Sequence, residues 1–210
     1  LSGVILGSSR RVLPWSSLIA GLEVHREEEL VRRAQRREPE AFGQLYEAHF
    51  DRIYRYVMLR VRNQADAEDI TQQVFLKALE KIGSYRWRGM PFSSWLFRIA
   101  HNLVVDYWKK KGRETVRALA PEEIDDIAVS ASDPVAEAEL QFDVNQLMAA
   151  CEQLTEAQRE IISLRFAGGL SVKESAKVMG RSEGAVKVLQ HAALAKLRRI
   201  LCPAGEGADV

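Results

Sequence analysis

The chain has 210 residues, a formal net charge of +1 and 47% hydrophobic residues. This length suits one or two soluble domains, and the small net charge identifies no charged partner, because a binding surface depends on local charge. Cys151 and Cys202 lie far apart and belong to no metal-binding pattern. They therefore predict neither a disulfide framework nor a zinc site, and they suit a reducing compartment such as the cytoplasm.

The first 24 residues share only some features with a targeting segment. Arg10 and Arg11 precede an apolar run as in a signal peptide, but Pro14 and Gly21 interrupt that run, which is too short to cross a bilayer. We therefore expect residues 1–24 to be a disordered or artefactual leader, with the native start near Val24. We also expect no insertion into a membrane.

Apolar residues recur at helical spacing from Glu27 onward, and no segment alternates as a strand would. The pattern predicts a short helix over residues 30–34, a longer helix over 42–59 and a third helix over 66–82. On the third helix, Asp69, Gln72 and Gln73 lie one turn apart on a side away from the apolar stripe. Taken alone, these polar residues indicate no more than a solvated face. The expected buried stripe comprises Ala67, Ile70, Val74, Ala78 and Ile82.

Residues 90–113 form the most informative stretch of the chain, because they predict a helix with two different faces. Pro91 suits its first turn and Gly112 suits its end. Several cations near its C-terminus lie beside Trp108, whose indole could stack on a base. This pattern fits single-stranded nucleic acid and an ordinary core helix with a solvated basic end equally well. The expected apolar face comprises Phe92, Trp95, Leu96, Ile99, Leu103 and Tyr107, and the polar face comprises Arg98, Asn102, Asp106, Lys109 and Arg113.

A loop over residues 84–91 precedes this helix. It alternates two aromatic residues with two arginines, in the order Tyr85, Arg86, Trp87 and Arg88. Exposed aromatic side chains are uncommon in a simple connector, because leaving them in water forgoes the gain from burial. We therefore expect this loop to extend the stacking surface of the helix.

After Arg113 the composition becomes acidic. Residues 114–139 contain eight acidic residues and a single basic one, Arg117, together with Pro121 and Pro134. Such a segment has too few large apolar side chains to form a core, so we assign residues 114–136 to an extended acidic linker. The linker is either a solvated tether or a segment that lies in a basic channel otherwise occupied by nucleic acid.

Helical spacing returns in residues 137–201, where two capping boxes mark the starts of helices. Thr155 with Gln158 opens one helix, and Ser171 with Glu174 opens a short one. These boxes predict where the helices begin independently of the apolar pattern.

The spacing that follows is typical of a helix-turn-helix. Ala176 is small where two helices must cross, Gly180 suits a turn with positive φ, and Val186 would lock the second helix onto the first. Side chains on the outward face of the second helix could read base edges in DNA, and cations near its end could contact phosphates. The outward residues are Arg181, Ser182, Glu183, Lys187, Gln190 and His191, and the cations include Arg198.

Together these motifs resemble the extracytoplasmic-function sigma factors of bacterial RNA polymerase. The segments that carry the resemblance are DAEDITQQVF at 66–75, FSSWLFRIAHNLVVDYWKKKGR at 92–113, and residues 154–198. The resemblance implies an all-α fold of two small helical domains, a sigma2-like bundle over residues 25–113 and a sigma4-like helix-turn-helix domain over 137–201. The acidic linker would join them, and residues 202–210 would form a tail.

The resemblance also implies partners and site residues. Core RNA polymerase would bind through the clamp helices of its largest subunit, which carries over to Asp69, Gln72, Gln73 and Phe75, and through its flap. The displaced minus-ten strand of promoter DNA would be held by Tyr85, Arg86, Trp87, Arg88, Asn102, Asp106, Lys109, Lys110 and Arg113. The minus-thirty-five duplex would be read by Arg181, Ser182, Glu183, Lys187, Gln190, His191 and Arg198. Such factors are typically masked by an anti-sigma protein, so we expect one here.

Two other classes of function remain open from the residues themselves. A stand-alone helix-turn-helix regulator would account for residues 154–198, but it would leave Trp87, Trp95 and the surface of residues 66–75 without a role. An enzyme would need a phosphate-binding loop, a nucleophile with its base, or paired carboxylates in a pocket, and the sequence contains no such pattern. We therefore predict a protein that is not an enzyme and that uses no cofactor or metal.

Overall fold

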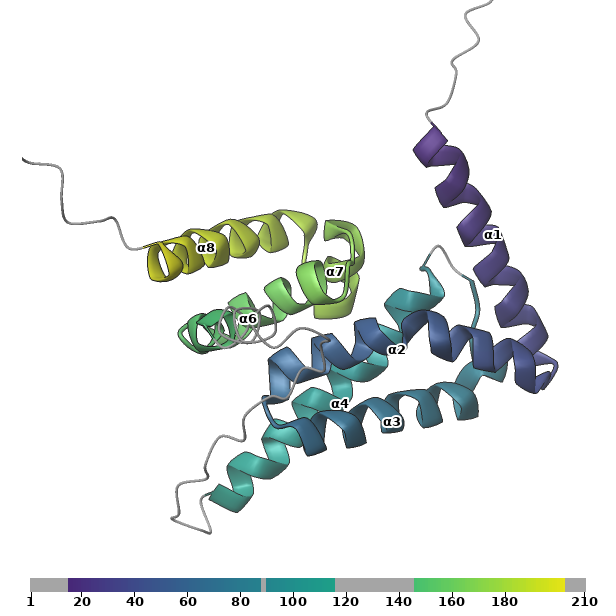
Figure 1. The fold of residues 1–210 in the computed structure, drawn as a ribbon, viewed down its shortest axis with the longest axis horizontal. Helices are drawn as coiled ribbons and strands as arrows, with labels where there is room; N and C mark the ends of the chain where they lie inside the picture. The colour runs from purple at the N-terminus through teal and green to yellow at the C-terminus, as the bar shows by residue number, and fades with distance from the viewer. Residues whose placement is uncertain (1–14, 88–89, 116–145, 203–210) are drawn as a thin grey trace, which may run out of the picture.

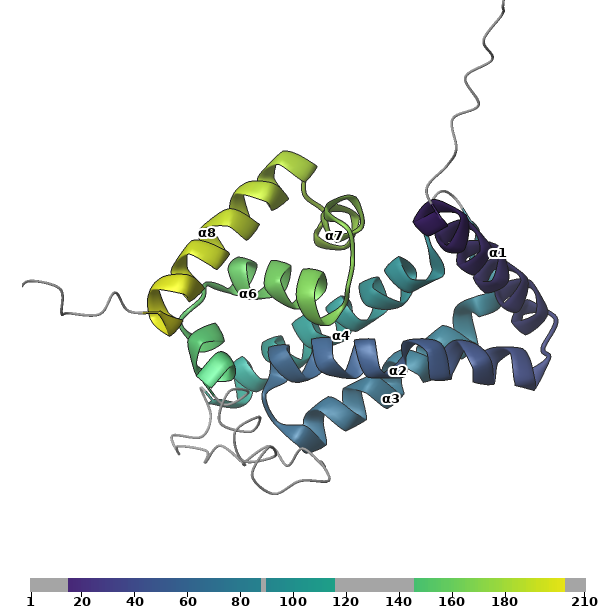
Figure 2. The same cartoon turned by 45° about the horizontal axis from the view of Figure 1, so that its top comes forward.

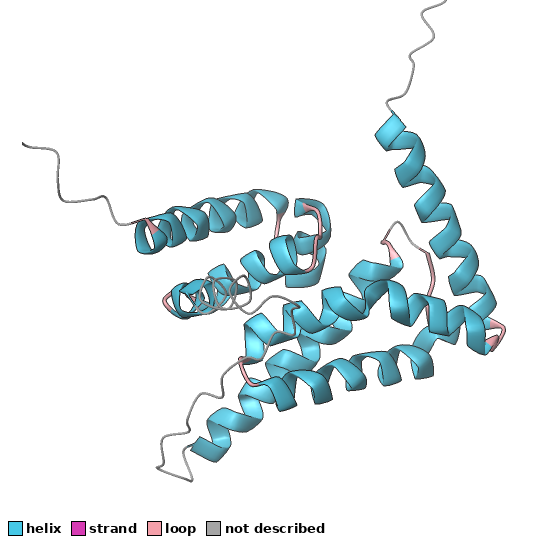
Figure 3. Ribbon diagram, in the orientation of Figure 1, coloured by secondary structure: helices cyan, strands magenta, loops and turns pink. Residues whose placement is uncertain are grey.

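A computed structural model describes residues 15–87, 90–115 and 146–202, and the described part contains helices and turns without a strand (Figure 3). This arrangement confirms the predicted all-α class. No helix in these three ranges is both long and apolar enough to cross a membrane. The predicted linker lies largely outside the described residues, since only 114 and 115 belong to a described element.

The first helix, α1 (Trp15–Gln35), starts earlier than the short helix expected over residues 30–34. It begins inside the stretch that we expected to be a leader, while residues 1–14 lie outside the described range. Its C-terminal end is fixed to the rest of the fold, because the Gln35 side-chain amide donates to the backbone oxygens of Ile82 and Tyr85. The N-terminal half of α1 projects away from the other helices (Figure 1).

Helices α2 (Pro39–Val61) and α3 (Gln64–Lys81) form an antiparallel pair. Pro39 occupies the first turn of α2, where its missing N–H group costs nothing. Asn63 caps α3 by accepting a hydrogen bond from the backbone N–H of Asp66. The apolar stripe predicted for residues 66–82 is buried at all five positions, with Ala67, Ile70, Val74 and Ala78 on α3 and Ile82 directly after it.

After the short turn η1 (Ile82–Ser84), the chain enters α4 (Phe92–Thr115), which packs against α2 and α3 (Figure 2). The expectation that Gly112 ends this helix is wrong, because α4 continues through it to Thr115. No Cβ placed at Gly112 would meet a neighbouring atom, and a glycine in such an exposed position weakens a helix without breaking it.

The C-terminal part begins with helical residues 146–152 and continues through α6 (Glu156–Ile162), the π turn η2 (Ser163–Ala167), α7 (Val172–Met179) and α8 (Glu183–Leu201). Both predicted capping boxes are present, at Thr155 and Ser171. Gly180 has φ of 63° and ends α7, as the helix-turn-helix spacing predicts. Ala176 and Val186 are buried where α7 and α8 meet.

The two helical parts are packed against one another and are not independent units. Helix α2 lies against η2, and α4 lies against α7 (Figures 1 and 2). Leu164, Leu170 and Val178 from the C-terminal part belong to the same buried cluster as the core of α2, α3 and α4. A second, smaller core lies between α6, α7 and α8. The two expected helical domains are therefore both present, and in this conformation they pack against one another.

Candidate nucleic-acid interface

The outward face of α4 carries polar and basic side chains. Asn102, Asp106, Lys109 and Lys110 are exposed, and Asp106 lies 3.8 Å from Lys109 across one helical turn. The opposite face is anchored in the core through Phe92, Leu96 and Leu103, with Trp95, Ile99 and Tyr107 partly buried. Cations near the C-terminus of a helix are stabilised by the helix dipole. The side chain of Arg113, although within α4, lies outside the described residues.

Two aromatic residues near the end of α4 have structural partners. The Tyr107 hydroxyl donates to Asp66 at 2.8 Å, and the Trp108 ring nitrogen donates to the backbone oxygen of Arg60 at 3.1 Å. Burial raises the pKa of the Tyr107 hydroxyl, and its hydrogen bond to Asp66 adds to this effect. Trp108 is half-buried against α2, which favours a packing role over stacking on a base.

The loop before α4 differs from the expectation of two exposed aromatic residues. Tyr85 is only 6% exposed, and its hydroxyl donates to the backbone oxygen of Met90. Its ring meets Trp87 edge to face, with centroids 6.3 Å apart, and also packs on Phe92 and Trp95. The expectation that Tyr85 is free to stack is therefore wrong, since it supports Trp87 from beneath. Arg86 is exposed, and Arg88 lies outside the described residues.

Helix α3 presents a separate exposed face. Asp69, Gln72 and Gln73 are exposed on it, whereas Phe75 is buried against Tyr46 and Phe50 and thus supports the helix from below.

Two further exposed residues of α3 escaped the sequence reasoning. Leu76 is 58% exposed and Leu79 is 50% exposed. Leu76 follows Asp69 by seven positions and Gln72 by four, so it continues the same face. Leu76 lies outside the predicted buried stripe of this helix, so its exposure could have been predicted from the sequence. The α3 face therefore combines polar groups with exposed leucines, a mixture typical of a protein-binding surface.

The helix-turn-helix exposes most of its predicted reading residues, on α8 and in the turn just before it. Arg181, Glu183, Lys187, His191 and Arg198 are exposed. Ser182 is also exposed, but its hydroxyl caps α8 by accepting from the backbone N–H of Ala185.

Gln190 differs from the other α8 residues because it is half-buried. Its side-chain oxygen accepts a hydrogen bond from Arg165 at 3.1 Å, and Arg165 also binds the backbone oxygen of Leu170. Arg165 could not be identified from the sequence as a partner of Gln190, because the pair spans 25 residues and three structural elements.

Two segments of the chain match models of known protein families. Residues 45–114 match Sigma-70 region 2, and residues 150–199 match Sigma-70 region 4. The chain is 30% identical over 162 residues to the ECF RNA polymerase sigma factor SigX of Bacillus subtilis, covering 76% of this chain and 83% of SigX. It belongs to the extracytoplasmic-function sigma factors. Another such sigma factor, BldN of Streptomyces coelicolor, is 42% identical over 175 residues, which cover 82% of this chain and 65% of BldN.

Solved sigma factor structures share the fold. CnrH, in complex with the cytosolic domain of CnrY, superposes with a TM-score of 0.65 at 22% identity, covering 86% of this chain and 99% of CnrH. RpoE of Bartonella quintana, in complex with the anti-sigma factor NepR, gives a TM-score of 0.66 at 24% identity, covering 78% and 98%. In this sigma factor the α3 and α4 faces lie within region 2, and the helix-turn-helix lies within region 4.

Proposed function

We propose that this protein directs core RNA polymerase to promoters and opens the minus-ten region. Its membership of the sigma factor family supports the proposal, and the single observation that carries it is the α3 face. There the exposed Leu76 and Leu79 lie beside Asp69 and Gln72. A stand-alone DNA-binding regulator has no use for this face, whereas a factor that docks on the polymerase clamp helices needs one.

The α4 face would hold the unpaired minus-ten strand. Unstacking a base costs a few kcal/mol, so opening succeeds only where the protein recaptures the exposed base. Asn102 offers both a donor and an acceptor to a base edge, and Trp87 offers a ring on which a base can stack. Lys109 and Lys110 would bind the phosphate backbone and release its counterions.

Helix α8 would read the minus-thirty-five duplex in the major groove. Lys187, Gln190 and His191 lie at a spacing of three and four residues, so they share a helical face. An arginine has only donors, so the Gln190 oxygen must face Arg165 and its NH₂ group is left to face DNA. This orientation favours acceptors on base edges, namely N7 of either purine, O6 of guanine and O4 of thymine.

We further propose that an anti-sigma protein binds this factor, by analogy with RpoE and NepR. A cytoplasmic location follows from the proposed partners, because core polymerase and promoter DNA lie there. The two cysteines are unpaired in the structure, which suits such a reducing compartment.

Co-purification with core polymerase and transcription in vitro test this function. The wild-type protein should bind core polymerase and direct start sites that core polymerase alone does not use. Gln72→Ala should weaken polymerase binding first, whereas Asn102→Ala should leave that binding intact and reduce promoter opening, measured by permanganate reactivity of unpaired thymines. Lys109→Ala should reduce the salt slope of binding to a forked template by about 0.7.

The combined results of the binding and opening assays distinguish a sigma factor from a stand-alone regulator. A protein that binds duplex promoter DNA but never core polymerase would be a stand-alone regulator. Equal loss of polymerase binding and opening in both Gln72→Ala and Asn102→Ala would contradict the division between the α3 and α4 faces.

A further inference from the structure

Val188, on α8, is an apolar side chain that belongs to neither hydrophobic core. It is 71% exposed, the highest value among the large hydrophobic side chains that the structure describes. The apolar side of α8 packs toward α6 and α7 through Val186, Ala193 and Leu197, which are all buried. Because a helix turns by about 100° per residue, Val188 projects from the opposite side. The packing of the fold therefore gives no reason for an apolar residue at this position.

The positions one turn before and one turn after Val188 carry very small side chains. Gly184 and Ala192 occupy them, and both are exposed. A Cβ added at Gly184 would meet no atom within 4 Å. Figures 1 and 2 show α6 and α7 on one side of α8 and no described helix on the other. A partner can therefore approach the outer side of α8 closely enough to contact the Val188 methyl groups.

The charges on and beside α8 complement those of nucleic acid. The helix has one acidic residue, Glu183 in its first turn, whereas several exposed cations lie before and after Val188. Cations of this kind bind phosphates and position a helix on the duplex. The exposed cations are Arg181, Lys187, Arg198 and Arg199.

The immediate surroundings of Val188 do not resemble a protein-docking surface. On α3 two exposed leucines, Leu76 and Leu79, lie three positions apart and so share one face. No large apolar residue lies three or four positions from Val188, where the side chains are those of glycine, alanine and histidine. An isolated apolar side chain among cations suits the edge of a base pair better than an apolar protein surface.

The chemistry of valine limits what it can recognise on DNA. Its side chain has no hydrogen-bond donor or acceptor, so it cannot read the polar pattern of a base edge. In the major groove the C5-methyl group of thymine is the apolar feature that distinguishes the bases. Residues near the start of a recognition helix contact base edges, and Val188 lies about 8 Å along the axis from Glu183. Val188 is therefore placed and built to contact a thymine methyl group.

We propose that Val188 contacts the C5-methyl group of one thymine in the minus-thirty-five element and thereby selects an A·T pair at that position. The inference rests on the proposed function, because it assigns a base preference to the same helix. Lys187 precedes Val188 directly on α8 and carries only donors. The two adjacent side chains thus read different features, a polar base edge and a methyl group.

Replacing thymine with uracil tests this contact, because the two bases pair identically and differ by the methyl group alone. The full chain with core polymerase first selects duplexes from a random library. The preferred duplex is then made with deoxyuridine in place of one thymine at a time, in either strand, and each affinity is measured at the same salt concentration. For the wild type, one replacement should weaken binding about fourfold, as expected for the loss of one buried methyl group.

Two alanine variants make the test specific. Val188→Ala removes the methyl groups that would touch thymine, so the ratio of the thymine to the uracil affinity should fall from about four to about one. Alanine is a better helix former than valine, so the fold is retained. Leu194→Ala is the matched control, because Leu194 is also exposed on α8 but lies about 9 Å farther from the start of the helix. It should keep the wild-type ratio, and circular dichroism confirms that each variant is folded.

The outcomes bear separately on Val188 and on the proposed function. A selected element without thymine in either strand would overturn the contact, as would a wild type that binds every uracil duplex as tightly as its thymine counterpart. A Val188→Ala protein that keeps the fourfold ratio, or a Leu194→Ala protein that loses it equally, would also overturn the role of Val188. If the ratio changes as expected but the selected duplexes direct no transcript, the proposed function fails and the contact stands.

Discussion

Replacing Gly168 with alanine tests the close contact between the backbone of region 4 and helix α4. A Cβ at this position would lie 2.8 Å from the backbone oxygen of Leu164, and 2.8 and 2.9 Å from Cε1 and Cζ of Phe97. Gly168 has φ of −79°, which alanine also adopts readily, so the expected cost is steric and not conformational.

The size of the effect follows from how little the neighbours can move. Carbon atoms pack best at about 3.5–4.0 Å, the Leu164 oxygen belongs to the backbone, and Phe97 is completely buried. Forcing an extra methyl group into such a site costs about 1–3 kcal/mol. In a chain of this size each kcal/mol lowers Tm by roughly 2–4 °C, so Gly168→Ala should melt roughly 2–12 °C below the wild type.

A matched glycine provides the control. Gly184 lies in the first turn of α8, and a Cβ there would meet no atom within 4 Å. Alanine is favoured over glycine in a helix by up to about 1 kcal/mol, so Gly184→Ala should melt at or slightly above the wild-type temperature. Thermal unfolding followed by far-ultraviolet circular dichroism measures both. A Gly168→Ala protein as stable as the wild type would show that region 4 does not pack on Phe97 in this way.

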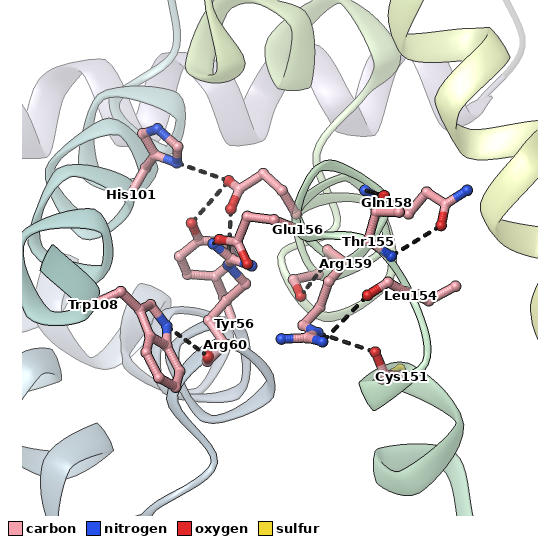
Figure 4. A network of polar contacts seen from close by, with 12 residues as sticks. Tyr56, Arg60, His101, Trp108, Cys151, Leu154, Thr155, Glu156, Gln158 and Arg159 are labelled. Atoms are coloured by element: carbon pink, nitrogen blue, oxygen red, sulfur yellow. Dashed lines mark hydrogen bonds and ion pairs between the residues drawn. The ribbon is translucent and has the colours of Figure 1, made fainter. Parts of the chain in front are cut away.

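Three further predictions follow from single residues. Tyr107→Phe removes the hydrogen bond to Asp66 and should lower the free energy of unfolding by about 1 kcal/mol in urea titrations; no change would mean that water replaces the bond fully. Maleimide should modify the exposed Cys202 well before Cys151, whose thiol pKa burial raises, and equal rates by mass spectrometry would contradict this. Burial opposes the charge of Glu156, but its hydrogen bond to Arg60 (Figure 4) and the positive charges of Arg60 and Arg159 together outweigh burial and lower the carboxyl pKa. The contribution of this contact to stability is therefore present above the usual value of 4.5 and is lost as the pH falls through the lowered pKa, which urea titrations of the wild type and Glu156→Gln at a series of pH values would detect.

The local structure could be predicted from the sequence because short-range physics decides it. Thr155 and Ser171 open helices because each side chain satisfies a backbone N–H group three residues away. Gly180 ends α7 because glycine accepts positive φ without strain. These features depend on a few neighbouring residues, so the sequence contains all the information that they need.

The π turn shows where helical spacing fails. Phe166 follows Ile162 by four positions, a spacing that places both on one face of a regular helix, yet Ile162 is buried and Phe166 is 60% exposed. The wider turn at Ser163–Ala167 changes the angular position of the residues that follow, so Leu164 is buried and Phe166 points outward. A period of 3.6 residues cannot foresee this change, because contacts with α2 accompany it.

For the candidate site, the sequence predicted which helix faces are polar, but it did not predict which individual side chains are buried. Tyr85 was expected to be exposed, but Gln35 of α1 holds the loop backbone and the Tyr85 hydroxyl binds the Met90 oxygen. The first of these contacts spans 50 residues. Likewise Arg60 and Glu160 look like ordinary surface charges on their own helices, and they become buried only because two distant helices meet. Amphipathic spacing identifies which face of a helix is apolar, but it does not identify the helix or loop against which that face packs.

The composition of the boundary between the regions indicates how it could open. Its charged groups, Arg60 and Glu160 above all, regain hydration when they separate, and this offsets much of their lost attraction. Leu164, Leu170 and Val178 have no such compensation, because exposing buried apolar side chains costs about 1.5–3 kcal/mol each. The isolated protein should therefore keep the two regions packed together mainly through these apolar side chains, because its charges alone would separate at little cost. Opening then requires a partner that covers these three side chains or stabilises the separated regions in another way, which is the role that binding to core polymerase would have.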